Sequence, residues 1–148
     1  MSFQFALQKV MELKEREKHN VQAEYEQAVA SFESVATELY EMLKRKEELE
    51  ESARSQIANG TSIYALQQQQ SKLLRLQQEI QKQQRHTQLA REKMNRKKQD
   101  LMSRSIEFKK YEKMKQVKQD QYEEEAKRLE LQQMDELSIR LYANVKVR

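Results

Sequence analysis

The sequence of 148 residues contains no proline, no cysteine and a single glycine, Gly60. Proline and glycine are the residues that most readily break helices, so almost nothing along this chain can end one. The absence of cysteine excludes disulfide frameworks and thiolate metal sites. No stretch of 18 apolar residues is present, and the opening Met1–Phe5 lacks the basic start and apolar core of a secretory signal. We therefore expect long helices in a cytoplasmic protein without direct membrane insertion.

The composition is also poor in apolar residues. They make up 37% of the chain against 35% charged residues, and the mean hydropathy is -1.07. This is less apolar material than an ordinary globular core requires. A coiled coil, which buries only a narrow seam, and a disordered chain both remain compatible with these values. The spacing of apolar residues has to decide between them.

The first part of the chain carries a heptad pattern. One series recurs every seven residues, and a second series lies four residues after members of the first; the two comprise Val21, Ala28, Val35, Met42 and Leu49, and Tyr25, Phe32, Leu39 and Ala53. A denser apolar patch near the N-terminus, out of phase with these series, comprises Phe3, Leu7, Val10, Met11 and Leu13.

The second part of the chain carries one clear stripe. It recurs every seven residues through Leu66, Leu73, Ile80, Thr87, Met94, Leu101 and Phe108, is interrupted at Lys115, and resumes at Tyr122 and Leu129. The companion positions, taken four residues after the stripe, are polar: Gln70, Gln77, Gln84, Arg91 and Lys98. Alone, this part would make a weak parallel dimer, so we expect it to pack against the first part.

The pair Asn59-Gly60 supplies the turn that such packing needs, with Thr61 or Ser62 capping the next helix. We predict an all-α fold, a long antiparallel two-helix coiled-coil hairpin forming one domain over residues 1–148. Its helices would span about 3–58 and about 62–144, with the turn at 59–61. Residue i would then lie near residue 120 minus i.

Charge supports this pairing. Residues 1–57 hold eight basic and twelve acidic side chains, net -4, whereas residues 82–118 hold thirteen basic and four acidic side chains, net +9. Antiparallel folding places the basic stretch against the acidic one. Beyond about Gln119 the second helix outruns the first, and a stripe at Met134, Leu137 and Leu141 would be left without a partner helix.

Residues that carry catalytic chemistry are scarce. One glycine excludes a phosphate-binding glycine loop, and His19 and His86 lack metal-ligand spacing. A two-helix hairpin offers no enclosed pocket, so we expect no enzyme activity, no metal and no cofactor. The basic stretch and a pI of about 9.2 raise nucleic-acid binding as an alternative. Neutralisation between the helices is the simpler explanation of this charge, and we expect no nucleic-acid partner.

Three stretches resemble the FliJ family of flagellar export proteins, the small coiled-coil components of the flagellar type III export apparatus. They are the opening Phe3–Lys14 with the Tyr25, Phe32 and Leu39 pattern, the Gly60 turn followed by a Gln-rich helix through Leu76–Ile80, and Met134–Ile139. The resemblance implies a fold similar to the stalk of rotary ATPases. It implies three partners: the hexameric flagellar export ATPase, the cytoplasmic part of the export gate, and export chaperones.

The resemblance also implies sites. Contact with the ATPase is expected at the two chain ends, through Leu7, Val10, Met11, Leu13, Met134, Asp135, Glu136, Leu137 and Ile139. The positions matching the family's gate-binding face are Glu38, Met42, Arg45, Leu49, Lys72, Leu76, Glu79 and Gln83. Only Met42, Leu49 and Leu76 are apolar among them. Leu76 lies off the predicted stripe, which makes it the best exposed candidate.

The hypothesis from the sequence is a mechanical adaptor that helps couple ATP hydrolysis to flagellar protein export, located in the cytoplasm at the inner face of the cell membrane. Two alternatives stay open. One is the equivalent stalk of a virulence-type injectisome, and the other is a basic coiled-coil tether of nucleic acid or cytoskeleton.

Overall fold

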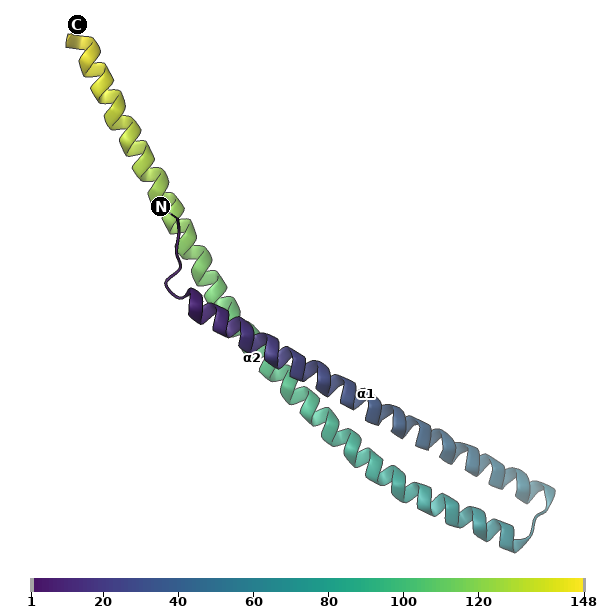
Figure 1. Ribbon diagram of the computed structural model, residues 1–148. Coiled ribbons are helices and arrows are strands. Elements are labelled where there is room, and N and C mark those ends of the chain that lie inside the picture. The colour runs from purple at the N-terminus through teal and green to yellow at the C-terminus, as the bar shows by residue number, and fades with distance from the viewer. Residues whose placement is uncertain (1, 148) are drawn as a thin grey trace. The chain divides into compact units, whose positions relative to one another are not determined.

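Two long helices, α1 (Gln8–Asn59) and α2 (Ile63–Val147), make up nearly all of the computed structural model (Figure 1). The structure describes residues 2–147, and no strand occurs among them. The two helices pack against each other, which confirms the predicted all-α hairpin. Met1 and Arg148, the ends of the predicted domain, lie outside the described residues. The extent of the domain stays a prediction.

The chain divides into two compact units. The turn unit comprises His19–Met102, and the terminal unit comprises Met1–Lys18 together with Ser103–Arg148. Each unit therefore contains part of both helices. In the terminal unit, the segments that belong together are more than 80 residues apart in the sequence.

Helix α1 begins later than predicted. The expected start was about Phe3, but residues 2–5 are not helical and the helix begins at Gln8. The Gln8 backbone N–H donates to the Phe5 carbonyl at 3.1 Å, and the Phe3 ring lies 5.7 Å from the Tyr122 ring in the same unit. Because aromatic residues are only moderate helix formers, this ring contact competes well with one further turn of helix.

The turn between the helices follows the sequence prediction closely. Gly60 has φ of +82°, the left-handed conformation that glycine adopts without steric cost. The Ser62 hydroxyl accepts a hydrogen bond from the Ala65 N–H at 3.1 Å, so Ser62, and not Thr61, caps α2. No described residue other than Gly60 has positive φ.

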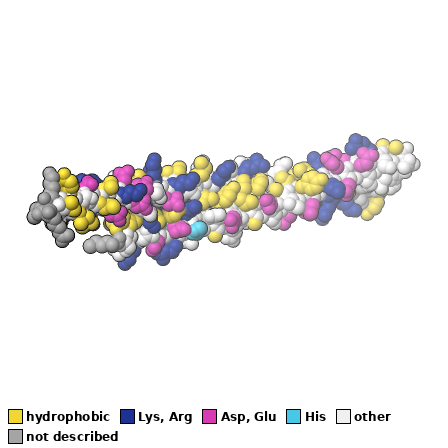
Figure 2. Space-filling view, turned by 90° about the horizontal axis from the view of Figure 1, so that it is seen from above, with side chains coloured by type: hydrophobic (Ala, Val, Ile, Leu, Met, Phe, Trp, Pro, Cys, Tyr) yellow, Lys and Arg dark blue, Asp and Glu magenta, His cyan; other side chains and the backbone are white. Residues whose placement is uncertain are grey.

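The seam of the turn unit uses the predicted series. Ala28 and Ile80 are 4% and 5% exposed, and the other members of the two α1 series are half-buried. In the middle of Figure 2, hydrophobic side chains form a lengthwise band bordered by charged ones. Because a two-helix seam covers each side chain from one direction only, no described side chain falls below 2% exposure.

The companion series of α2 is not the one taken in the sequence analysis. The positions taken four residues after the stripe are mostly exposed, whereas those three residues after it are withdrawn from solvent. The latter are Gln69, Leu76, Gln83, Ala90, Lys97, Arg104 and Tyr111. A heptad seam alternates steps of three and four residues, so both choices fit a single stripe. The partner helix decides which side of the stripe is covered.

In the terminal unit, the first turns of α1 pack on α2, where Met11 and Phe108 are each 8% exposed. Every described side chain of α2 from Asp120 to Val145 is exposed. Tyr122 and Leu129 continue the stripe in phase, yet they are 36% and 48% exposed. The predicted exposed C-terminal stretch of α2 is therefore present in the structure.

Candidate functional site

The apolar patch at the start of α1 lies half on the seam and half in solvent. Met11 is buried and Val10 is half-buried, while Leu7 and Leu13 are 38% and 47% exposed. Helical geometry explains the exposure of Leu13, which points about 200° away from Met11. Leu7 precedes the first residue of α1 and lies at the open end of the seam. Leu7 and Leu13 are thus the members available to a partner.

Two adjoining hollows flank this patch, and both have basic linings. One is lined by Met11, Lys109, Glu112, Lys113, Lys115, Gln116 and Gln119, and the other by residues 3–6 with Gln8, Lys9, Glu12 and Lys115. Lys115, which interrupts the α2 stripe in the sequence, borders both. The interruption therefore marks the place where the seam gives way to an exposed basic surface.

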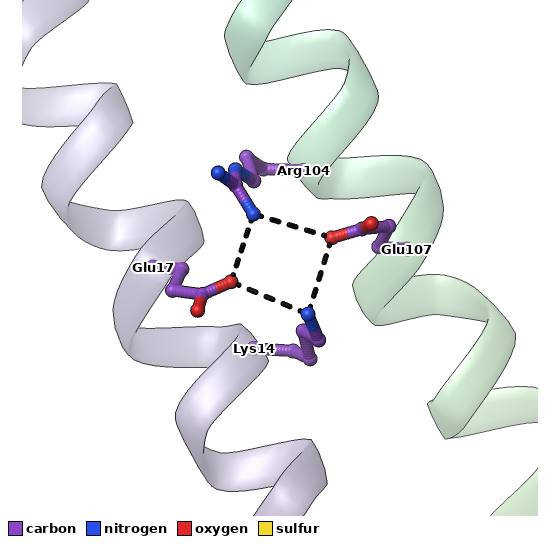
Figure 3. A network of polar contacts seen from close by, with 4 residues as sticks. All are labelled: Lys14, Glu17, Arg104 and Glu107. Carbon is purple, nitrogen blue, oxygen red and sulfur yellow. Dashed lines mark hydrogen bonds and ion pairs between the residues drawn. The ribbon is translucent and has the colours of Figure 1, made fainter.

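A network of four charged residues lies beside the patch (Figure 3). Arg104 Nη1 donates to Glu17 Oε2 at 3.0 Å and lies 3.5 Å from Glu107 Oε2. Lys14 Nζ lies 3.6 Å from both Glu17 Oε2 and Glu107 Oε2. Nearby, Lys18 Nζ is 5.1 Å from the centre of the Phe108 ring. Lys14 and Lys18 stand seven residues before Val21 and Tyr25, so they continue the two α1 series with charged side chains in place of apolar ones.

The predicted C-terminal contact residues are all exposed. Met134, Leu137 and Ile139 are 65%, 60% and 68% exposed, and Asp135 and Glu136 are also exposed. Met134 and Leu137 share one face with Leu141 and border a shallow hollow with Glu130 and Gln133. Ile139 lies about 200° around the helix from Leu137 and so belongs to another face.

The two parts of the predicted ATPase site lie in the same unit but at different levels of α2. Met11 shares a hollow with Lys113, and Met134 lies 21 residues further along the helix. At 1.5 Å per residue, this separation is roughly 30 Å. The predicted residues thus lie in two separate regions and do not form one continuous patch.

The predicted gate-binding residues lie in the turn unit. Met42 and Leu49 are half-buried, as their seam positions require, but Leu76 is only 5% exposed. The expectation that Leu76 lies off the seam is wrong, because it occupies a companion position of α2. Leu49 and Leu76 instead form the floor of a groove whose other lining residues are Arg45, Lys72, Arg75 and Glu79.

Sequence reasoning missed a second groove, next to the turn. Its lining is mainly apolar and comprises Leu49, Ala53, Ile57, Ile63, Leu66, Gln67, Gln69, Gln70 and Leu73. Ile57 and Ile63 are 62% and 76% exposed. Their positions on either side of Gly60 were the available signal, since apolar residues beside a solvated turn have no seam to enter.

Within residues 2–147, no group of three or more carboxylate or imidazole side chains could hold a metal ion. Over the same residues, neither helix has a stretch long and apolar enough to cross a bilayer. The candidate binding surfaces consist of apolar side chains bordered by charged ones.

Comparisons with known proteins agree with this anatomy. The family model described as Flagellar FliJ protein matches residues 3–146. The Flagellar FliJ protein of Bacillus subtilis (strain 168) is 36% identical over 142 residues, which cover 96% of this chain and 97% of that protein.

A solved structure of a YscO homologue from Chlamydia trachomatis matches with a TM-score of 0.67 and 17% identity, covering 99% of each chain. At that identity, the likeness concerns the fold. The family match covers nearly the whole chain and identifies a component of flagellar type III export. The chain belongs to the flagellar FliJ family.

Proposed function

We propose that this protein is an adaptor of the flagellar export apparatus that contacts the export ATPase through its terminal unit and the export gate through its turn unit. It works by binding, without a cofactor or reaction of its own. It resides in the cytoplasm at the inner face of the cell membrane. By holding both partners, it helps couple ATP hydrolysis to protein export.

The ATPase-binding proposal is carried by the exposure of apolar side chains in the terminal unit. Five apolar side chains are 38–68% exposed: Leu7, Leu13, Met134, Leu137 and Ile139. Moving such side chains out of water into an interface lowers the free energy. Val10 and Met11 support the α1 region from the seam side. Asp135 and Glu136 add negative charge beside the C-terminal apolar residues, which favours a partner surface with basic side chains.

The gate-binding proposal rests on the groove of the turn unit. Leu49 and Leu76 form its apolar floor, Arg45, Lys72 and Arg75 place three positive charges on its border, and Glu79 adds one negative charge. Met42 lies one heptad before Leu49 on α1. This arrangement fits a partner segment that offers apolar side chains with an excess of acidic ones. Export chaperones are further partners in this proposal.

Stimulation of the flagellar export ATPase tests the first half of the proposal. We expect the wild-type protein to raise ATP turnover and ring assembly, and Leu137→Asp and Leu7→Asp to weaken both effects. Leu89→Asp is a matched control, because Leu89 is 55% exposed in the turn unit. No stimulation by the wild type would refute coupling, and full stimulation by both variants would refute the site.

Capture of the cytoplasmic part of the export gate tests the second half. Lys72→Glu reverses a charge at the groove and should reduce capture, whereas Lys82→Glu changes an exposed lysine that does not line it. Equal capture by the two variants would place the gate surface elsewhere.

A further inference from the structure

Among residues 2–147, four pairs of polar side chains join the two helices and obey one rule. In each pair, the residue numbers add up to 121. The pairs are Glu38 with Gln83 at 3.0 Å and Glu24 with Lys97 at 2.9 Å in the turn unit, and Glu17 with Arg104 at 3.0 Å and Lys14 with Glu107 at 3.6 Å in the terminal unit. The spacings of acidic and donor residues on the two helices therefore match.

The apolar seam alone does not select this register. Its members recur every seven residues on both helices, so a slip of one heptad again sets seam positions against seam positions. After such a slip, Met42 would meet Leu73 or Thr87 in place of Ile80. Seam positions thus meet seam positions in all three registers, and another contribution has to distinguish them.

The polar pairs supply the distinction. If the sum rises to 128, only Glu24 keeps a charged partner, Arg104, because Glu38, Glu17 and Lys14 would face Ala90, Tyr111 and Met114. If it falls to 114, Glu17 and Lys14 find Lys97 and Asp100, but Glu38 would face Leu76 and Glu24 would face Ala90. Either slip loses at least two pairs and leaves the Glu38 carboxylate opposite an apolar side chain.

Gln83 is the most buried member, with 7% exposure. Its Nε2 donates to the Val35 carbonyl and to Glu38 Oε2, each at 3.0 Å. A buried amide that loses its partners is costly, whereas each exposed ion pair contributes little. A buried polar side chain is a known way to fix the register of a helical seam.

The turn is less suited to this task. A Cβ atom added at Gly60 would meet no atom within 4 Å, and residues of both helices line the groove beside the turn. None of the four pairs lies between residue 39 and residue 82. The sequence closest to the turn thus contributes none of the pairs that distinguish one register from another.

We propose that these four polar pairs, with Gln83 as the buried member, select the register of the two helices against slips of one heptad. A slip would displace the start of α1 along α2 by roughly 10 Å. The pairs therefore determine which α2 residues border the α1 patch in the terminal unit. This assignment concerns pairing within the chain and does not depend on the proposed partners.

Cysteine cross-linking measures the register directly, because the chain has no cysteine of its own. Ala28→Cys with Met94→Cys, whose numbers add to 122, reports the observed register. Ala28→Cys with Thr87→Cys or with Leu101→Cys reports a slip of one heptad in either direction. In the otherwise unchanged protein, we expect the first pair to form a disulfide and the other two to form very little.

The test combines Glu17→Lys, Glu24→Lys and Gln83→Leu. We expect the native disulfide yield to fall about fivefold or more and a slipped pair to form, because two ion pairs between the helices and both hydrogen bonds of Gln83 are lost. Restoring Gln83 and adding Lys97→Glu and Arg104→Glu re-creates the pairs with opposite sign and should return the native disulfide.

Circular dichroism shows whether the triple variant keeps its helices. If it does not, Gln83→Leu alone, which exchanges a buried amide for an apolar side chain, should still admit a slipped disulfide. Retention of the native disulfide as the sole product in all folded variants would overturn the proposal. It would equally be overturned if two glycines inserted after Gly60 moved the disulfide to a slipped pair, since the turn would then set the register.

Discussion

Two regions of α2 carry apolar residues with the same spacing and have opposite exposures. In the turn unit, Leu76 and Ile80 are 5% exposed, whereas Leu129, Leu137 and Leu141 in the terminal unit are 48–60% exposed. Both regions are helical and rich in charge. The difference is that α1 packs alongside the first region only. Heptad spacing therefore predicts which side chains can be buried, but the partner helix determines which of them are buried.

Truncation of an apolar side chain should have different effects in the two regions of α2. We expect Ile80→Ala to lower the free energy of unfolding by about 2–4 kcal/mol, since it removes buried methyl groups. Leu137→Ala should lower it by less than about 0.5 kcal/mol, because the side chain is already in water. Urea denaturation followed by circular dichroism measures both, and equal losses would show that the C-terminal stripe is buried in solution.

A substitution at Gly60 tests whether packing of the two helices depends on the conformation of this residue. Gly60→Ala should lower the free energy of unfolding by about 1–2 kcal/mol, because alanine is strained at a φ of +82° while its methyl group meets no neighbour. Thr61→Ala, beside it and outside the helices, is the control. Thermal unfolding in which Gly60→Ala matches the wild type would mean that the turn adopts another conformation.

The polar part of the seam gives a smaller effect. Gln83→Ala should cost about 1 kcal/mol, because it removes the hydrogen bonds to Val35 and Glu38. Gln84→Ala, a substitution at the exposed neighbouring position, should change the free energy of unfolding by less than about 0.3 kcal/mol. If chemical denaturation gives the same midpoint for both, Gln83 is not buried in the seam in solution.

The smallest effect concerns the surface charges. Glu24→Gln should cost about 0.5 kcal/mol in dilute buffer and almost nothing in 1 M salt, because the ion pair with Lys97 is partly exposed and screened by salt. Glu26→Gln, which removes an exposed carboxylate without an ion pair, is the control. A salt-independent loss for Glu24→Gln would indicate a packing role for this side chain.

Much of the fold follows from the sequence. The missing proline, the single glycine and the α1 series predict the hairpin, the turn and the seam, and the cross-helix sum of 121 lies one residue from the predicted 120. The Ser62 cap is one of the two expected. These features depend on neighbouring residues or on a strict repeat, which sequence reasoning handles well.

The sequence predictions were wrong at positions whose burial or conformation depends on contacts with the other helix. The companion positions of α2 cannot be chosen from one stripe, so Leu76 was expected to be exposed and is buried. The late start of α1 depends on the contact of Phe3 with Tyr122, which lies more than 100 residues away in the sequence. The site residues taken from the resemblance remain proposals. Among them, Leu7 and Leu137 are exposed and can contact a partner directly, whereas Met11 is buried in the seam.

Hydrogen exchange along α2 tests most directly the claim that α1 protects only part of this helix. We predict slow amide exchange from about Leu73 to Tyr111 and fast exchange from about Gln121 to Val145, because most of the stability of a helix in a protein comes from packing against a partner. Equally slow exchange along the whole of α2, or equally fast exchange along all of it, would contradict the account.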